Sequence, residues 1–376
     1  MQPLKNLTVI DVSRLLPGGF CTMVLADLGA SVIKVEQPGL GDYMRLAPPF
    51  VDGVSPFHST VNKNKLSISV DLKTNEGREI LIKMVKDSDV FVEAFRPGVM
   101  KRLGLDYASL RKHNNKLVYC SLSAFGQNEK LSLMPGHDLN FQAMSGIFSY
   151  VKKPTFPTVQ LADMVSGLYA AIAILAALNQ KPRRSVHLDI PITQCLTSLL
   201  ILHLGRYFSG SKADFDRLLY GEEPVYRFYM TKDKKFLAVA AIEQKFRKNL
   251  LRLLGLEEEE EEENLMVKGK RKIVSSRLAK IFKSKDRNEW MELLAGKETC
   301  VAPVLEIGEV LSSGWSDAVF DRKLRVLKTP VKMESSETVE LKPAPTLGKD
   351  TCAIMKKLGY KAGQIENYRK KGIIQF

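Results

Sequence analysis

Three positions in the sequence carry side chains that can move a proton and that lie beside a turn or a helix start. His137 belongs to the segment PGHD, a turn that opens an apolar stretch, and Asp138 is close enough in sequence to orient its imidazole. Asp163 lies near the start of a second apolar segment, next to small residues. Glu243 lies where a predicted strand meets a predicted helix. Imidazole and carboxylate groups are typical general acids and bases of enzymes.

Each of these groups also has a purely structural interpretation. A His-Asp pair after a turn is a common helix cap, which would explain His137 without any chemistry. Aspartate is a common N-cap, so Asp163 could serve only to bind the first amides of its helix. Apolar neighbours would raise the pKa of Asp163 and the helix dipole would lower it, so its direction stays open. Glu243 has the same two interpretations, because glutamates at a helix start usually pair with the dipole.

The elements that must position these groups begin with alternating strand and helix patterns. Helices are predicted at residues 20–28, ended by Gly29, and from Thr74 onward. Such alternation is typical of right-handed βαβ crossovers and a mostly parallel sheet. We expect buried strands at residues 7–12, 31–35, 66–72, 89–95 and 117–122.

Ligands in open α/β sheets bind beyond the carboxyl ends of the strands, which makes polar residues there candidate walls of a site. These candidates are Gln37, Arg96 and the residues from Val70 to Lys73, and ordinary surface polarity is the alternative for each. The turn SRLLPGG after the first strand lacks GxGxxG, and no GxxxxGK[ST] loop exists, so a dinucleotide cofactor is disfavoured. The five cysteines are scattered without a CxxC pair, which disfavours structural zinc.

The later part of the chain changes character. Two apolar segments flank the polar turn TKDKK and predict a β-hairpin, and the run Glu257 to Glu263 predicts a solvated loop. A last amphipathic helix is expected from Asp350 to Leu358, ended by Gly359. We therefore expect a large domain at 1–208, a linker at 209–224, a small domain at 225–325 and a return to the large domain at 326–376.

Composition bounds the class of protein. The 376 residues include 45% hydrophobic and 26% charged residues, as in a soluble globular protein with enough material for a core. The formal net charge of +14 fits nucleic acid or a small polyanion, but no basic stripe or reader motif supports nucleic acid. The apolar segment from Val165 to Leu178 is too short to span a bilayer and predicts a buried helix. With no apolar signal core and no SKL ending, we expect a cytoplasmic protein without a membrane span, and a peroxisome or mitochondrion is the alternative in a eukaryote.

Taken in order, these segments resemble a known superfamily. The resemblance rests on LTVIDVSRLLPGGFCTMVLADLGASVIKVEQP, NKLSISVDLK, EAFRPGVMKRLG, LSAFGQ, GHDLNFQAMSG, LADMVSGLYAAIAILAAL, FLAVAAIE and APTLGKDT. Together they resemble the family III CoA-transferase (CaiB/BaiF) superfamily, and within it the α-methylacyl-CoA racemases most. The resemblance implies an α/β fold: a Rossmann-like large domain with a parallel sheet, formed by both ends of the chain, and a smaller α+β domain. It also implies an interlaced homodimer with the active site between subunits.

The same resemblance implies roles for individual residues. The catalytic histidine falls on His137, the catalytic aspartate on Asp163 and a supporting glutamate on Glu243. Gln37 stands where an arginine is frequent in this family. The acyl-CoA contacts would fall on Gln37, Val70, Asp71, Leu72, Lys73, Arg96, Gly136, Asp138, Leu139, Asn140 and Phe141.

These residue types suit chemistry at the carbon next to a thioester. Inverting that carbon takes a base on one face and an acid on the other, roles that His137 and Asp163 can fill without a metal or redox cofactor. In the CoA-transferases of the superfamily the aspartate is instead a nucleophile, a role that does not need His137. GHD together with IE favours the racemase branch. A non-catalytic binder is the third hypothesis, disfavoured because both His137 and Asp163 are present.

Overall fold

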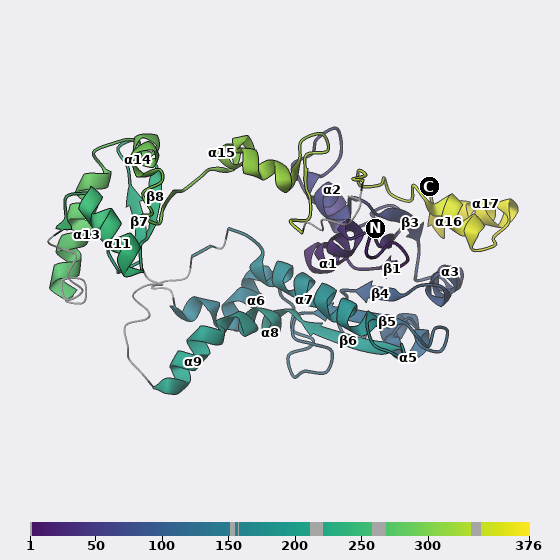
Figure 1. The fold of residues 1–376 in the computed structure, drawn as a ribbon. Helices are drawn as coiled ribbons and strands as arrows, with labels where there is room; N and C mark the ends of the chain where they lie inside the picture. The colour runs from purple at the N-terminus through teal and green to yellow at the C-terminus, as the bar shows by residue number, and fades with distance from the viewer. Residues whose placement is uncertain (1, 151–154, 157, 211–220, 258–267, 332–339) are drawn as a thin grey trace. The chain divides into compact units, whose positions relative to one another are not determined.

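The chain forms two compact units in the computed structural model, which is shown as a ribbon in Figure 1. Unit 1 contains residues 1–147, 156–202 and 317–376, and unit 2 contains residues 148–155 and 203–316. The linker predicted at 209–224 lies largely outside the described part of the chain, as does most of the glutamate run. The structure describes residues 2–150, 155–156, 158–210, 221–257, 268–331 and 340–376.

Unit 1 is built on a seven-stranded sheet with the strand order β12-β3-β2-β1-β4-β5-β6. Every neighbouring pair is parallel except β12 with β3, which confirms the α/β class with a parallel sheet. The strands are β1 (Thr8–Asp11), β2 (Ser31–Glu36), β3 (Leu66–Val70), β4 (Val90–Glu93), β5 (Val118–Ser123), β6 (Val186–Pro191) and β12 (Ile374–Gln375).

Helices cover both faces of this sheet, because its central strands are apolar on both sides. One face packs against α3 (Asn75–Lys86), α16 (Thr351–Lys357) and α17 (Ala362–Lys370). The other face packs against α1 (Leu16–Asp27) and α7 (Leu161–Leu178). The helix predicted from Asp350 to Leu358 is present as α16, but it is not the last element, since α17 and then β12, at the edge of the sheet, follow it.

The remaining elements of unit 1 are short. A two-stranded ribbon of β10 (Phe320–Asp321) and β11 (Val326–Leu327) accompanies them. Two of the short helices, η2 (Ile147–Tyr150) and α9 (Ile201–Ser209), lie at the boundary with unit 2 in the sequence. The others are η1 (Tyr43–Leu46), α2 (Pro56–Asn62), α4 (Val99–Leu103), α5 (Tyr107–Leu110), α6 (Asp138–Ser145), α8 (Ile192–Thr197) and η3 (Ser198–Leu200).

Unit 2 contains the predicted hairpin. Strands β7 (Tyr226–Met230) and β8 (Phe236–Ala240) are antiparallel, and β9 (Val301–Pro303) adds a third strand beside β8. Their apolar side chains form a separate core with three helices, α11 (Gln244–Leu253), α13 (Lys268–Phe282) and α14 (Arg287–Leu294). The unit ends with α15 (Ile307–Ser312) and η5 (Gly314–Ala318).

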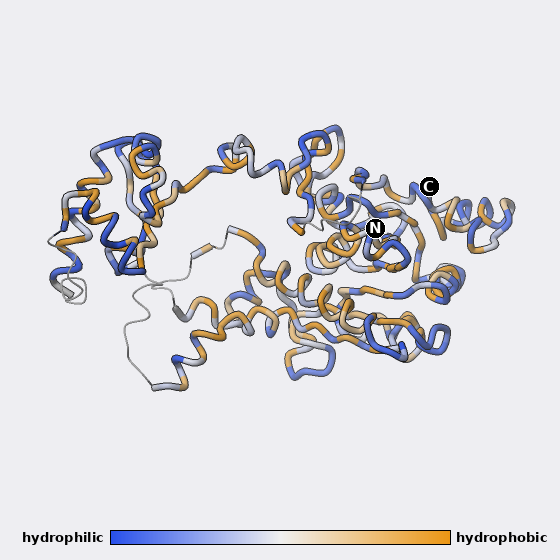
Figure 2. Tube along the Cα trace, viewed as in Figure 1, coloured by the Kyte–Doolittle hydropathy of each residue, from blue (hydrophilic) through white to orange (hydrophobic). Residues whose placement is uncertain are grey.

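Helix α7 is longer and more exposed than the sequence predicted. It spans 18 residues, is strongly apolar (Figure 2), and by length and composition is the one helix in the described residues that could cross a membrane. A stripe of mostly small side chains is buried, whereas Leu168, Tyr169 and Ile172 on its other side are exposed. The helix predicted from Val165 to Leu178 is present, but it starts at Leu161, so it is longer than predicted and only partly buried.

Gly167 allows α7 to approach α1 closely. A Cβ atom at this position would lie 2.8 Å from the carbonyl oxygen of Pro17 and 3.0 Å from Cδ1 of Phe20. We expect Gly167→Ala to lower the free energy of unfolding by about 1 to 3 kcal/mol, the usual cost of overpacking, measured by thermal unfolding. Gly363→Ala in α17 is the control, because nothing lies within 4 Å of its added Cβ. Equal stabilities of the two variants would contradict the prediction.

Candidate active site

A buried charged cluster holds the loop between β1 and α1 in place. The ammonium group of Lys34 lies 3.0 Å from a carboxylate oxygen of Asp42 and donates to the carbonyl oxygen of Ser13 at 2.6 Å. Asp42 in turn accepts from the backbone N–H of Leu15, which has a positive φ of 63°. Burial alone would raise the pKa of Asp11 beneath this loop, but Lys34 and a second buried lysine lower it to about 2. The loop is thus fixed by groups that stay charged.

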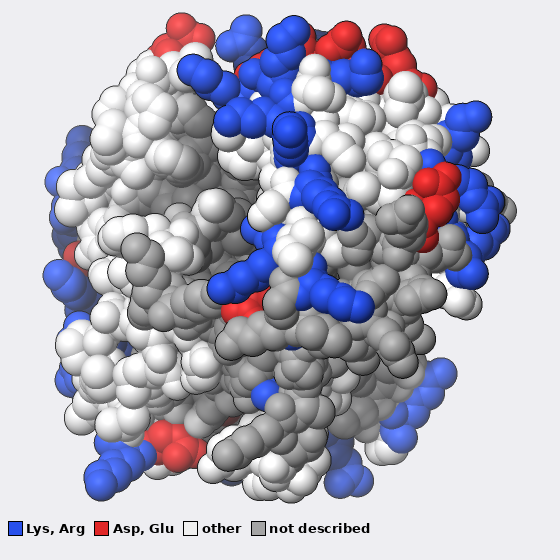
Figure 3. All heavy atoms as spheres, turned by 90° about the vertical axis from the view of Figure 1, so that its left-hand side faces the viewer, with Lys and Arg blue, Asp and Glu red and all other residues white. Residues whose placement is uncertain are grey.

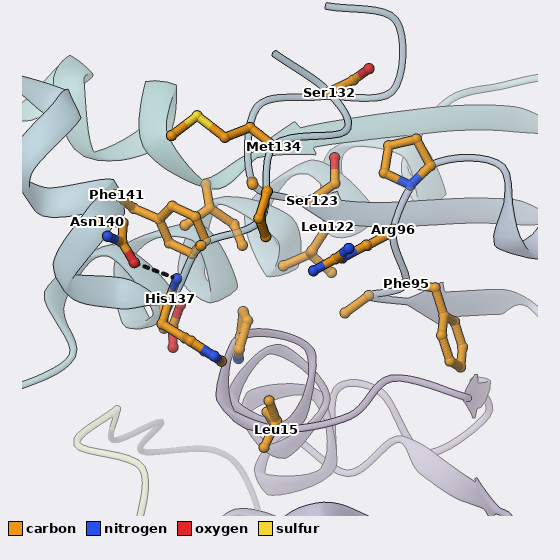
Figure 4. Close-up of a pocket in the computed structure, with 18 of the residues that line it drawn as sticks. Leu15, Phe95, Arg96, Leu122, Ser123, Ser132, Met134, His137, Asn140 and Phe141 are labelled. Carbon is orange, nitrogen blue, oxygen red and sulfur yellow. Dashed lines mark hydrogen bonds between the residues drawn. The ribbon is translucent and has the colours of Figure 1, made fainter.

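A cavity of about 470 Å³ opens beyond the carboxyl ends of β4 and β5, and we call it the polar cavity. In Figure 4 the Arg96 side chain points toward the side on which His137 lies, whereas the Phe95 ring points away. Both candidate proton-transfer groups of unit 1 line it. Its polar lining side chains are Arg14, Arg96, Ser123, Ser132, His137, Asn140 and Asp163.

A second cavity, which we call the apolar cavity, shares Leu15, His137 and Asp163 with the polar cavity. It has a volume of about 570 Å³, and no lysine or arginine is among its lining residues. The two proton-transfer groups therefore lie at the junction between a polar and an apolar space. Most of the apolar lining comes from Leu16, Phe20, Met23, Met44, Phe57, Val61 and Met164.

A third cavity, the rim cavity of about 340 Å³, shares Arg14 and Phe95 with the polar cavity. It is lined by Gln37 and by the residues from Val70 to Lys73, which the sequence predicted to be walls of a site. The guanidinium of Arg14 donates to the side-chain oxygen of Gln37 at 2.8 Å and lies 5.3 Å from the ring centroid of Phe95. A cation is therefore present beside Gln37, although it comes from a different strand end.

His137 lies directly before α6, at its N-cap position. Its backbone N–H donates to the side-chain oxygen of Asn140 at 3.1 Å, the bond drawn in Figure 4. Asp138 does not orient the imidazole, because its carboxylate accepts hydrogen bonds from Gln142 and from the start of α7. This arrangement fixes the backbone of His137 while its side chain faces both cavities.

Asp163 is the third residue of α7, and Gln160 rather than Asp163 occupies the N-cap position. Within the described residues its carboxylate has no hydrogen-bond partner, so this group does not cap the helix. Burial, with a further contribution from the negative charge of Asp138, raises the pKa of Asp163 to about 7. The effect of desolvation on the pKa of Asp163 therefore outweighs that of the helix dipole, and Asp163 can both hold and release a proton near neutral pH.

The raised pKa of Asp163 predicts a pH-dependent cost in stability. Its pKa rises from 3.8 to about 7 on folding, so the native state binds the proton more tightly than the unfolded state. Stability therefore falls as pH rises from about 4 to 7, by up to about 4 kcal/mol. We expect Asp163→Asn to have a higher Tm than the parent at pH 8 and a smaller advantage at pH 4.5. An advantage that does not change with pH would contradict this prediction.

Most of the residues predicted for the site line one of the three cavities, and Leu139 and Glu243 do not. Arg96, Gly136, Asn140 and Phe141 line the polar cavity, and Asp138 lines the apolar cavity. Leu139 lines none of the three cavities and is exposed.

Glu243 belongs to unit 2, where it is the exposed N-cap residue of α11. The residues that sequence reasoning missed are Arg14, Leu15, Phe95 and Arg102. The signal for Arg14, Leu15 and Phe95 was their position in the loops that follow β1 and β4, whereas Arg102 lies on α4.

Positive charge is distributed over both units. Arg14 and Arg96 line the polar cavity, and Lys73 and Arg102 line the rim cavity. In unit 2 the segment KGKRKIVSSRLAKIF of α13 carries basic residues and no acidic ones. Figure 3 shows Lys and Arg gathered in clusters on the face that it views, with fewer Asp and Glu. An anionic ligand would therefore meet cations at the cavities themselves and a positive field around the molecule.

Known proteins share this architecture. Residues 4–351 match the model of CoA-transferase family III. The mouse protein "Succinyl-CoA:glutarate CoA-transferase" is 32% identical over 401 residues, covering 100% of this chain and 91% of the relative. The human protein "Alpha-methylacyl-CoA racemase" is 31% identical over 389 residues, covering 99% of this chain and 97% of the relative. A CaiB/BaiF family protein from Brucella suis has a similar structure, with a TM-score of 0.85 and 28% identity over 95% of this chain and 99% of that one.

Proposed function

This chain belongs to CoA-transferase family III, and from that membership we propose that it is a racemase of the α-methylacyl-CoA type. It would epimerise the 2-methyl centre of acyl-CoA thioesters. The observation that carries the proposal is that His137 and Asp163 line both the polar and the apolar cavity. A thioester has the same two sides, a polar coenzyme and an apolar acyl chain, with the reacting carbon between them.

The three cavities suggest how the substrate would lie. The coenzyme would occupy the rim and polar cavities, where Arg14, Lys73, Arg96 and Arg102 supply cations for its phosphate groups. The acyl chain would enter the apolar cavity, whose lining offers no cation to a second carboxylate. A dicarboxylic acyl group placed there would bury an unpaired charge, which is unfavourable. The proposed substrate class is therefore an apolar 2-methylacyl thioester.

The chemistry then needs only side chains and backbone amides. One of the pair His137 and Asp163 takes the proton from the carbon next to the thioester carbonyl, and the electron pair moves onto the carbonyl oxygen as an enolate. The other group returns a proton to the opposite face, and the carbonyl re-forms with inverted configuration. The first N–H groups of α6 lack intrahelical partners and begin beside His137, so they are the proposed donors to the enolate oxygen. The supporting role of Glu243 stays a prediction from the family resemblance.

The second candidate is CoA transfer between carboxylic acids, favoured by the presence of Asp163 and Arg96 in one cavity. In this reaction the Asp163 carboxylate attacks the thioester carbon and expels CoA thiolate, which leaves a mixed anhydride. The thiolate then attacks the aspartyl carbonyl, which gives the aspartyl-CoA thioester and releases the first carboxylic acid, and Arg96 would pair with the carboxylate of the incoming acid. The pKa of Asp163 near 7 suits acid and base work better than a role that requires the carboxylate throughout. We therefore place transfer second.

One experiment separates these functions. The protein is incubated with an optically pure 2-methylacyl-CoA in D2O, and separately with acyl-CoA and free carboxylic acids. Deuterium at the α-carbon together with loss of optical purity supports the racemase. Transfer of CoA to an acid, with an adduct at Asp163 that hydroxylamine traps, would make the protein a transferase. With neither activity, the chain would be a binder of acyl-CoA.

We further propose that two copies form the interlaced homodimer, with apolar side chains of α9 at the contact. Among these, Ile201 is 73% and Phe208 80% exposed, and none of the residues of this helix is buried within the chain. We expect a solution mass of twice 42.2 kDa by light scattering. Phe208→Glu should shift the mass toward one chain, whereas Ile307→Glu, at a similarly exposed position on α15, should not. A monomeric parent protein would contradict the proposal.

A further inference from the structure

The side chain of Asp138 joins the two proton-transfer groups of unit 1. Asp138 follows His137 directly and is 8% exposed. One carboxylate oxygen accepts from the backbone N–H of Ala162 at 2.8 Å and of Asp163 at 3.1 Å. The other oxygen accepts from the side-chain amide of Gln142 at 2.5 Å. A single residue beside His137 is thus bonded to the backbone of Asp163 itself.

These bonds supply the cap that α7 lacks from its own sequence. The first N–H groups of a helix have no intrahelical acceptor. The N-cap residue of α7, Gln160, makes no side-chain capping bond, and the carboxylate of Asp138 on α6 takes that place. Because the cap comes from α6, the carboxylate of Asp163 is left to face the polar and apolar cavities. The spacing between His137 and Asp163 therefore depends on Asp138.

The same arrangement places a fixed negative charge beside Asp163. Burial is the largest cause of the raised pKa of Asp163, and among the described residues the negative charge of Asp138 adds to it. The bonds from the two backbone N–H groups and from Gln142 hold the Asp138 carboxylate in place beside Asp163. The other titratable or charged side chains that line the two cavities with Asp163 are Arg14, Tyr43, Arg96 and His137.

We propose that Asp138 is a positioning residue for the reaction: its carboxylate caps α7 from α6, which holds Asp163 in register with His137, and its negative charge beside Asp163 favours the proton-donating form of that group. The inference rests on the proposed function where it assigns a proton-donating role to Asp163. Its electrostatic part concerns the free protein and holds without any substrate. In a racemase that works in both directions, the acid on one face must be protonated while the base on the other face is not. A carboxyl group that titrates in the range of imidazole meets that requirement.

The test compares Asp138→Asn with Asp138→Ala. Asparagine keeps an oxygen that accepts from Ala162 and Asp163 but removes the charge, so it changes the electrostatics and keeps the cap. Alanine removes both. Asp106→Asn is the matched control, because Asp106 is also at a helix N-cap, bonded to Ser109, and lines none of the three cavities.

The first readout is the titration of Asp163 in protein labelled with ¹³C at the aspartate carboxyl groups, with the resonance assigned by its loss in Asp163→Asn. In the parent protein we expect Asp163 to titrate near pH 7. Asp138→Asn should lower the pKa of Asp163, because a neighbouring like charge is removed, and Asp106→Asn should leave it unchanged. An unchanged titration in Asp138→Asn, or a parent Asp163 that titrates near 4, would overturn the proposal. The parent measurement stands even where a variant does not fold.

The second readout is the pH profile of α-proton exchange. In Asp138→Asn, the part of the pH profile that reports the titration of Asp163 should move to lower pH. In Asp138→Ala the same shift is expected, together with a lower exchange rate at every pH and a lower Tm. A merely structural Asp138 would lower the rate without this shift, and that result would overturn the electrostatic part. Failure of the proposed function has a different signature, since the parent protein would then show no exchange while the titration remained measurable.

Discussion

The substitution His137→Ala is expected to lower the rate of racemisation of a 2-methylacyl-CoA by on the order of 10²- to 10⁴-fold, the usual contribution of a general acid or base. In the proposed mechanism His137 serves one face of the substrate, and the variant has no group there to give or take the proton. Asp163 remains on the other face, so one enantiomer should still exchange its α-proton in D2O with retention of configuration. Loss of inversion with exchange of one enantiomer is the expected signature.

Mass spectrometry and chiral analysis of the recovered thioester measure the two quantities separately. His113→Ala is the matched control, because His113 is exposed and lines none of the three cavities. An unimpaired His137→Ala variant would rule out a role for this imidazole. If the same variant kept CoA transfer at the parent rate, the transferase would be the correct function, since that chemistry does not use the histidine.

The fold followed from the sequence wherever strands are buried on both faces. Strands β1 to β5 are short apolar runs, which are typical of a parallel sheet covered by helices. The segment VHLDIP of β6 was missed because its side chains alternate between partly buried and exposed at the edge of the sheet. Strand β12 has only two residues and no pattern of its own. Only its pairing with β3 makes it a strand, which local sequence cannot reveal.

The site was predictable in its chemistry and less so in its supports. Residues 137 and 163 were identified by side-chain type and by family resemblance, and they line the same two cavities. The role of Asp138 as the cap of α7 was not predictable, because the bond joins residues 24 positions apart. Likewise the cation beside Gln37 is Arg14, from the loop after another strand. Contacts of this kind depend on tertiary packing, and no local spacing records them.

The substitution Asp163→Asn is expected to have the widest effect, because every proposed reaction uses this carboxyl group. Asparagine has nearly the same shape but neither donates nor accepts a proton in this pH range and is a poor nucleophile. We expect racemisation to fall by on the order of 10²- to 10⁴-fold and any aspartyl-CoA adduct to disappear. The enantiomer that still exchanges should be the opposite of the one that exchanges in His137→Ala, since the remaining base is on the other face.

The change of the exchanging enantiomer between the two variants distinguishes the loss of one base from a general loss of activity, which an assay of total activity does not. Misfolding, a blocked cavity or weaker binding would lower exchange of both enantiomers, whereas the loss of one base in two lowers exchange of one. Asp163→Asn is also expected to be more stable than the parent at pH 8, because a buried charge is removed, so its loss of activity would occur in a folded protein. If both variants kept exchange of the same enantiomer, His137 and Asp163 would serve the same face, and the two-base mechanism would be wrong.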